Sequence, residues 1–115
     1  MAPSFGTSGL RGLVIDLTEE VVADYVNAFL TTLPECDTLF IGQDLRPSSP
    51  DIAQMICRTA LRAGVDVVDC GALGTPALAL ASMKAGAAAI MITGSHIPAD
   101  RNGLKFYVPQ GEISK

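Results

Sequence analysis

The chain has 115 residues, of which 49% are hydrophobic, and its formal net charge at pH 7 is −4. A sequence this rich in Ala, Val, Leu and Ile is typical of a compact α/β or helical domain and argues against intrinsic disorder. An acidic chain with 5% aromatic residues and no Trp is poorly suited to nucleic acid, because it repels the phosphate backbone and offers few stacking surfaces.

The amino-terminal segment and the cysteines bear on the compartment. Residues 1–12 contain no apolar signal core, and no apolar run approaches the roughly 18 residues of a membrane span, so we expect a cytoplasmic protein with no membrane partner. Cys36, Cys57 and Cys70 are widely spaced and form neither a C-x-x-C motif nor a Cys/His cluster. This spacing argues against a zinc site and predicts buried free thiols in a reducing compartment.

The first predicted element is a helix over residues 18–33. Thr18 suits the N-cap, Glu19 suits the positive end of the helix dipole, and apolar residues recur at helical spacing until Pro34 ends the run. The apolar segment 38–42 ends in glycine and predicts a buried strand.

A second helix is predicted after the loop that follows this strand. Ser49 suits its N-cap, Pro50 its first helical position and Gly64 its end. The apolar segment 65–70 then predicts the next strand.

The carboxyl-terminal half repeats the alternation of helix and strand. Thr75 suits the cap of a third helix that runs to Lys84, with Gly86 as its stop. The continuous apolar run 87–93 predicts a strand that is covered on both faces, and 104–108 predicts a last strand.

This alternation predicts a three-layer α/β/α domain over residues 1–115, with a mixed, mostly parallel four-stranded sheet. A loop of about ten residues is too short for a helical crossover, so the last strand is expected to run antiparallel to its predecessor. Ligands of such sheets bind beyond the carboxyl ends of the strands. The loops at 42–49, 71–76 and 93–103 are therefore expected to lie on one edge.

The segment "GTSGLRG" (6–12) is rich in glycine and small hydroxyls and contains Arg11. Backbone N–H groups and a guanidinium in such a loop can bind a phosphate. The alternative interpretation is a flexible lead-in to the first helix, and the segment alone favours neither.

The two middle loops carry weaker signals. In "GQDLRPSS" (42–49), Arg46 could lie near an anion, but a plain strand-to-helix connection with a Ser-Pro cap and Asp44 paired to Arg46 is favoured. The segment "GTPA" (74–77) is better explained by helix capping.

The segment "TGSHIPADRNGLK" (93–105) is the most informative one. Ser95 could act as a nucleophile, or carry a phosphoryl group if cations surround it. A hydrolase elbow would read G-x-S-x-G, which does not occur here, so a Ser-His-Asp hydrolase is disfavoured. The alternative is a loop histidine at His96 and a tight turn at Asn102–Gly103 before a strand.

Four segments together resemble a known family. They are "FGTSGLRG", "GQDLRPSS", "GTPAL" and "ITGSHIPADRNGLKFY", in this order. The chain resembles the N-terminal domain of the α-D-phosphohexomutases, the phosphomannomutase/phosphoglucomutase family. The serine loop differs from the family pattern at Gly94, where Ala is usual, and at Ile97, where Asn is usual, but it keeps the Ser-His pair.

The resemblance implies a role for each motif residue. Ser95 would be the phosphoserine that donates a phosphoryl group to a hexose phosphate and recovers one from the hexose 1,6-bisphosphate, and its phosphate would help to ligate Mg²⁺. Arg11 and Lys105 would neutralise the transferring group, and Lys105 is also a candidate for proton transfer at the sugar hydroxyl. His96 would shape the loop and contact substrate or phosphate. The implied substrate- and phosphate-binding residues are Thr7, Ser8, Gly9 and Asn102.

The family's acidic metal loop D-G-D-x-D-R, its sugar-recognition loop and its distal phosphate loop lie in later domains, and no D-x-D-x-D run occurs here. The resemblance therefore implies one module of an isomerase that interconverts hexose 1-phosphate and 6-phosphate. We expect the remaining mutase domains as partners, no activity from the chain alone, and self-association through the uncovered domain interface. The alternative is a non-catalytic phosphosugar-binding or protein-interaction domain that kept the fold.

Overall fold

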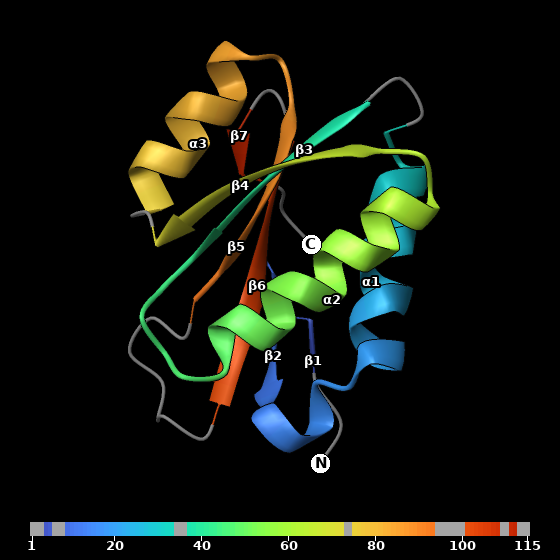
Figure 1. Cartoon of the computed structure of the whole chain (residues 1–115). Coiled ribbons are helices and arrows are strands. Elements are labelled where there is room, and N and C mark those ends of the chain that lie inside the picture. The colour runs from blue at the N-terminus through green and yellow to red at the C-terminus, as the bar shows by residue number, and fades with distance from the viewer. Residues whose placement is uncertain are drawn as a thin grey trace.

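The structure, a computed structural model, describes residues 4–5, 9–33, 37–72, 75–93, 101–108 and 111–112. In these ranges one sheet lies between two layers of helix, with α1 and α2 on one face and α3 on the other (Figure 1). The elements in chain order are β1 (Ser4–Phe5), β2 (Gly9–Leu13), the 3-10 helix η1 (Val14–Asp16), α1 (Glu19–Thr31), β3 (Thr38–Gln43), α2 (Ser49–Arg62), β4 (Asp66–Ala72), α3 (Thr75–Lys84), β5 (Ala88–Ile92), β6 (Arg101–Val108) and β7 (Gly111–Glu112).

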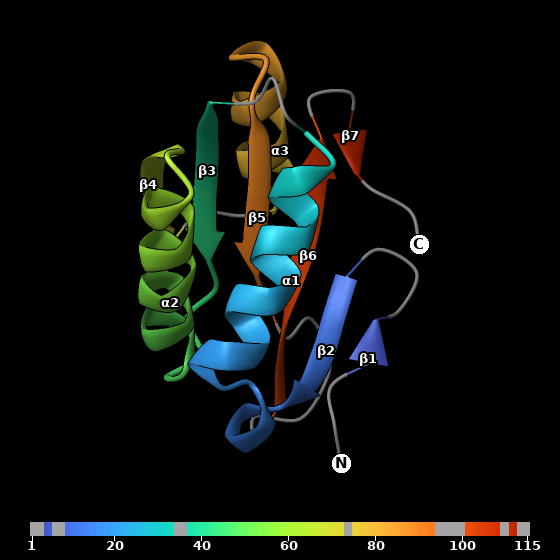
Figure 2. The same cartoon turned by 90° about the vertical axis from the view of Figure 1, so that its right-hand side faces the viewer.

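The strand order is β1-β2-β6-β5-β3-β4, and β7 pairs with the other end of β6 (Figure 2). The four strands expected from the sequence are neighbours in the order β4-β3-β5-β6. The pairs β3–β4 and β3–β5 are parallel, and β5–β6 is antiparallel. These pairings confirm the predicted mixed α/β/α fold and the antiparallel direction of β6. The direction follows from the short β5–β6 connection, which permits no helical crossover.

Among the described residues, the sheet has seven strands, where the sequence pattern predicts four. The glycine-rich segment 6–12, expected as a loop, contributes residues 9–12 to β2, which pairs antiparallel with β6. Its few apolar residues give no alternating pattern, yet Leu10 is fully buried in the core. Pairing with a distant strand, rather than local propensity, makes this segment a strand.

A second correction concerns the start of β6. The expected strand began at residue 104, with Asn102–Gly103 as a tight turn, but β6 begins at Arg101. Asn102 and Gly103 pair in register with Gly12 and Arg11 of β2. The turn prediction is wrong because the unforeseen strand β2 supplies a pairing partner for these residues.

Helix α1 begins as its sequence predicts. The Thr18 hydroxyl accepts a hydrogen bond from the Val21 N–H at 3.3 Å, which satisfies one free donor of the first turn. The helix buries Val22, Val26 and Leu30, which recur at a spacing of four residues and so lie on one face.

Helix α2 corrects the predicted cap. The helix begins at Ser49, so Ser48 occupies the cap position, and the Ser48 side chain makes no capping hydrogen bond. Neither the Ser48 nor the Ser49 hydroxyl caps the helix, because both form hydrogen bonds with other elements, which are described below. The Ser-Pro pattern predicted the position of the helix start to within one residue, but not the use of these hydroxyls.

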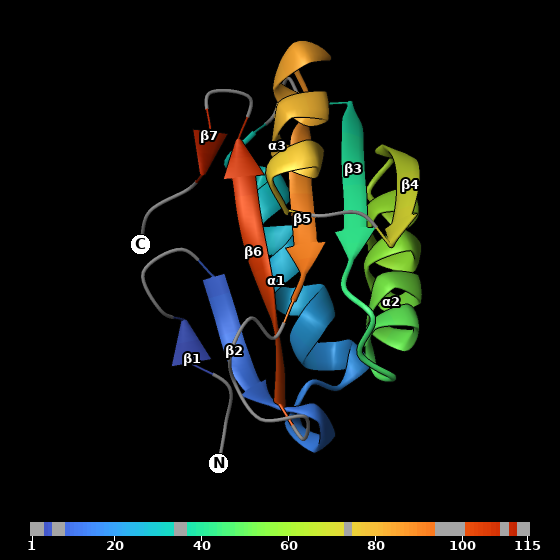
Figure 3. The same cartoon turned by 90° about the vertical axis from the view of Figure 1, so that its left-hand side faces the viewer.

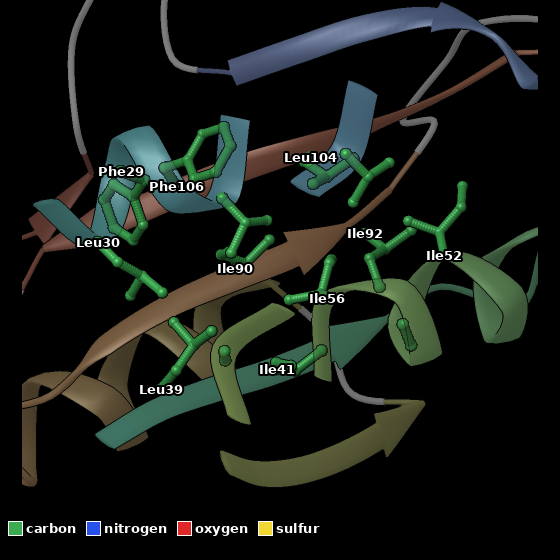
Figure 4. Packing of buried hydrophobic residues seen from close by; sticks show 14 of the residues in the cluster. Phe29, Leu30, Leu39, Ile41, Ile52, Ile56, Ile90, Ile92, Leu104 and Phe106 are labelled. Carbon is green, nitrogen blue, oxygen red and sulfur yellow. The ribbon is translucent and has the colours of Figure 1, made fainter. Parts of the chain in front are cut away.

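The larger part of the core lies between the sheet and helices α1 and α2. Phe29 of α1 and Phe106 of β6 are in ring contact, with centroids 4.9 Å apart and planes tilted by 47°. Every residue of β5 is buried, as predicted for a strand with helices on both faces. Figure 4 shows this packing; the labelled side chains are Phe29, Leu30, Leu39, Ile41, Ile52, Ile56, Ile90, Ile92, Leu104 and Phe106.

A smaller cluster lies between α3 and the opposite face of the sheet. Leu78 of α3 packs with Ala89 and Met91 of β5 and Tyr107 of β6. Gly42 of β3 lies beneath this helix, and a Cβ atom there would be 3.1 Å from Leu78 Cδ2 and 3.2 Å from Met91 Sδ. The absence of a side chain at Gly42 therefore lets α3 approach the sheet closely.

We expect Gly42→Ala to lower the free energy of unfolding by about 1–3 kcal/mol, because the new methyl group overpacks a filled interface. Urea unfolding measures the change. In a Leu78→Val background, which removes one methylene, the same substitution should cost measurably less. An equal cost in both backgrounds would show that contact with Leu78 is not the cause.

The cysteines are less buried than expected. Cys57 and Cys70 are free thiols of intermediate exposure, and Cys36 lies outside the described residues. Desolvation is the main cause that raises the pKa of each described thiol, and the nearby Asp69 carboxylate adds to it. Among the helices that the structure describes, none is both long and apolar enough to span a membrane.

Candidate functional site

Several strands bring an end to one edge of the sheet. The parallel strands β3, β4 and β5 end there, while β6 begins and β2 ends there, because β6 runs antiparallel to both of its neighbours. The amino-terminal end of α2 lies at the same edge (Figure 3). We call this the carboxyl-end edge. The ends of β3, β4 and β5, after which the three loops were predicted, lie at this edge, as the sequence predicts. Residues 73–74 and 94–100 of those loops lie outside the described residues.

Several predicted site residues lie outside the described part of the chain. Ser95 and His96 lie in the segment 94–100, and Thr7 and Ser8 lie in the segment 6–8. The described residues that flank the first segment are Thr93 and Arg101, and both lie at the carboxyl-end edge. The expected placement of Ser95 at this edge stays a prediction.

The structure brings Lys105 close to two other predicted positions. Lys105 pairs in register with Met91 of β5 on one side and with Gly9 of β2 on the other. Arg11 pairs with Gly103, two residues along the same ladder. The Lys105 side chain is half-buried. Figure 3 shows that α3 covers the part of its sheet face that is farther from the carboxyl-end edge.

Two backbone hydrogen bonds hold the start of the serine segment. The Thr93 N–H donates to the Gly103 carbonyl at 3.0 Å, which joins its entry to its exit. The Asp44 N–H donates to the Ile92 carbonyl at 2.8 Å, which joins the entry to the loop after β3. The segment 94–100 thus leaves from a base that is fixed on two sides.

Asn102 forms the buried part of this base. Its side chain is fully buried, and its amide nitrogen donates to the Ser48 hydroxyl at 2.8 Å and the Ser49 hydroxyl at 3.0 Å. The family resemblance implied that Asn102 contacts substrate or phosphate. Here both amide N–H groups have protein partners, so contact with a ligand would require Asn102 to release them.

Asp44 completes the set of contacts. Its Oδ1 atom accepts the Ser49 hydroxyl at 2.6 Å and the Arg46 N–H at 3.1 Å. Its Oδ2 atom forms an ion pair with Arg46 Nε at 3.4 Å. The favoured interpretation of the loop 42–49, a local pair of Asp44 and Arg46, is confirmed. Arg46 is therefore partly neutralised where it stands.

Sequence reasoning missed the contact of Asn102 with the two serines. The partners are more than 50 residues apart in the chain. The sequence offered one signal, a pair of adjacent serines directly before a helical proline, and helix capping explained that signal without any distant partner.

A complete metal site is not present among the described residues. No group of three or more His, Cys, Asp or Glu side chains in the described ranges is arranged to hold a metal ion. The donor set that the resemblance implied for Mg²⁺ in this chain was a phosphate on Ser95 alone. One phosphate does not make a Mg²⁺ site, so the described residues do not fit the metal without ligands from elsewhere.

Proteins of a known family resemble this chain over almost its whole length. The model of the family described as "Phosphoglucomutase/phosphomannomutase, alpha/beta/alpha domain I" matches residues 2–114. A phosphomannomutase of Sinorhizobium fredii is 57% identical over 100% of this chain and 26% of its own length. A phosphomannomutase of Salmonella muenchen is 49% identical over 97% of this chain and 24% of its own length.

A solved structure agrees with these sequence relatives. The X-ray structure of a phosphoglucomutase/phosphomannomutase family protein from Burkholderia thailandensis has a TM-score of 0.84 and 28% sequence identity to this chain, over 96% of this chain and 27% of that one. This chain spans about a quarter of the length of the curated relatives that it matches.

Proposed function

Since the chain belongs to the phosphoglucomutase/phosphomannomutase family, as its α/β/α domain I, we propose that it is the phosphoserine module of a phosphohexomutase. The proposed carrier of the phosphoryl group is Ser95. The observation that carries this proposal is the fixed base of the segment 94–100 at the carboxyl-end edge, with Lys105 and position 11 on the adjoining β2–β6 ladder.

The proposed reaction has two transfers. A hydroxyl of the hexose phosphate attacks the phosphorus of phosphorylated Ser95: a sugar O–P bond forms, the P–Oγ bond breaks, and the sugar loses a proton while Ser95 Oγ gains one, so that hexose 1,6-bisphosphate and a free serine hydroxyl result. After the bisphosphate has reversed its orientation, Ser95 Oγ attacks its other phosphoryl group; a P–Oγ bond forms, that sugar O–P bond breaks, and the proton returns to the sugar oxygen. Because phosphoryl transfer depends on positioning and charge neutralisation, the protein must hold few groups accurately.

The other motif residues take supporting roles in this proposal. Lys105 and Arg11 neutralise charge on the transferring group, and Lys105 is also the candidate for proton transfer at the sugar hydroxyl. His96 shapes the serine segment and contacts the phosphate. Thr7, Ser8 and Gly9 bind phosphate through their backbone and hydroxyl groups in this proposal. The register pair of Gly9 with Lys105 supports a role for Gly9 beside that cation.

The whole enzyme would supply what this domain lacks. Mg²⁺ binding needs carboxylates beyond the described residues, and selection among hexose phosphates needs a recognition loop from another domain. The proposed enzyme is cytoplasmic, and the later mutase domains are its intramolecular partners. Exposed apolar side chains would meet such a domain or, in its absence, a second copy; those in the described ranges are Ile15, Leu45, Leu61, Val68, Leu80 and Met83.

Turnover by the longer enzyme and by the isolated domain tests this function. The enzyme in which this domain precedes the later mutase domains should convert hexose 1-phosphate to 6-phosphate when primed with hexose 1,6-bisphosphate. The 115-residue chain alone should show no measurable turnover, because it lacks the metal and sugar-recognition loops. No conversion of any hexose phosphate by the longer enzyme would favour a non-catalytic binding domain, and turnover by the isolated chain would contradict the proposed division of labour.

A further inference from the structure

One chain of hydrogen bonds at the carboxyl-end edge leads from Gly103 through Asn102 and Ser49 to the Asp44 carboxylate. We propose that Asn102, Ser49 and Asp44 form a positioning relay, which holds both ends of the segment 94–100 and sets its place relative to Lys105. The existence of the relay is independent of the proposed function. Its importance for phosphoryl transfer rests on that function.

Gly103 sets the orientation of the Asn102 amide. The Gly103 N–H donates to Asn102 Oδ1 at 2.8 Å. If the amide were reversed, its NH₂ group would face this N–H, and two donors would oppose each other. The Asn102 NH₂ group must therefore point to Ser48 and Ser49, as observed.

This orientation determines what Ser49 does. A hydroxyl has one hydrogen to donate, and the Ser49 oxygen already accepts from Asn102. Its hydrogen goes to Asp44 Oδ1, 2.6 Å away, a short distance typical of a hydroxyl bonded to a carboxylate. Each step from Gly103 through Asn102 and Ser49 to Asp44 therefore donates in the same direction. Ser49 and Asn102 are fully buried, so water cannot replace either group at little cost.

Asp44 reaches both ends of the serine segment through this relay. Its backbone N–H holds the entry by donating to the Ile92 carbonyl. Its carboxylate holds the exit through Ser49 and Asn102, and the Gly103 carbonyl in turn accepts the Thr93 N–H. Loss of the relay should let the two ends move relative to each other. A misplacement of about 1 Å at a reacting group can lower a rate by about 10²-fold.

Ser48 provides a matched control. It accepts from the same Asn102 amide at 2.8 Å, but it is only half-buried, where water can take the place of its oxygen. The described bond that continues to Asp44 comes from Ser49. Ser49→Ala should therefore break the relay, whereas Ser48→Ala should leave it intact.

Amide hydrogen exchange of the 115-residue chain tests the relay without any activity. In Ser49→Ala we expect the Thr93 and Gly103 amides to exchange about tenfold faster, with the Ile90 amide in the middle of β5 as the reference. Ser48→Ala should change these rates by less than about threefold. Equal protection of Thr93 and Gly103 in the two variants would overturn the relay.

Kinetics of the longer enzyme test the link to transfer. Ser49→Ala should lower kcat by about 10²-fold with little change in KM, because the phosphoryl carrier is misplaced while substrate contacts persist. Asp44→Ala should behave likewise, and Asp44→Asn should recover most of the lost rate because its Oδ1 still accepts from Ser49. If Ser49→Ala fails to fold, the same hydrogen-exchange test is carried out on Asp44→Ala and Asp44→Asn.

The outcomes separate the relay from the proposed function. If Ser49→Ala makes the Thr93 and Gly103 amides exchange faster but leaves kcat unchanged, the positioning role is refuted. Ser95 can still be the phosphoryl carrier in that case. If Ser49→Ala and Ser48→Ala lose kcat equally, the relay is refuted as well. Loss of thermal stability with an unchanged kcat of the folded enzyme would mark Ser49 as merely structural.

Discussion

Replacement of Ser95 by alanine in the longer enzyme is expected to lower mutase turnover by on the order of 10⁴-fold or more, because the phosphoryl group then has no carrier. The change removes a single oxygen atom, so the fold should be unaffected. Turnover is measured with hexose 1-phosphate and a catalytic amount of bisphosphate. Circular dichroism and thermal unfolding should match those of the unsubstituted enzyme.

Ser82→Ala is the control for this substitution. Ser82 is buried in α3, where its hydroxyl donates to the Ala79 carbonyl, and it belongs to no proposed site. We expect a small loss of stability and full turnover from it. Full turnover by Ser95→Ala would refute the assignment of the phosphoryl carrier, whatever the control does.

The second large effect is expected from Lys105→Met. This change keeps most of the apolar stem and removes the charge, and we expect kcat to fall by about 10²–10³-fold with a smaller change in KM. The reason is that the ammonium group neutralises charge that develops during transfer. Lys105→Arg should retain part of the rate, because it keeps the charge but changes its geometry.

Lys84→Met is the matched control for Lys105→Met. Lys84 is exposed in the last turn of α3 and lies outside the proposed site. Lys84→Met should leave kcat and KM within about twofold of the unsubstituted enzyme, because an exposed charge outside the site contributes little to either. A larger KM with an unchanged kcat in Lys105→Met would instead mean that Lys105 binds the ground-state phosphate, and its proposed role in transfer would be wrong.

Elements that depend on their own residues could be predicted from the sequence. Helix α1 carries a threonine cap and apolar residues at helical spacing, and β5 is a continuous apolar run, so both were predicted close to their observed bounds. Strand β2 could not be predicted in this way. Its residues form a strand because β6 offers backbone partners, and no local pattern reports a partner some 90 residues away.

The candidate site likewise has contacts that could be predicted from the sequence and contacts that could not. The order of strands placed the loops after β3 and β5 on one edge, and the spacing of Asp44 and Arg46 predicted their local pair. The contact of Asn102 with Ser49 could not be predicted, because it joins the start of β6 to the start of α2, and these elements meet only when the sheet forms. The buried Asn102 amide needs acceptors for its two N–H groups, and Ser48 and Ser49 supply them. The two hydroxyls therefore do not take the capping role that the Ser-Pro sequence suggested.

The central claim is that Ser95 carries the phosphoryl group, and mapping the phosphate tests it most directly. The longer enzyme is incubated with labelled hexose 1,6-bisphosphate, digested, and its phosphopeptides are located by mass spectrometry. We predict a single phosphate on Ser95, which adds about −1.5 to −2 charges at neutral pH beside Lys105. Phosphate on Ser8, Ser48 or Ser49 instead, or no phosphate in an enzyme that turns over, would contradict the account.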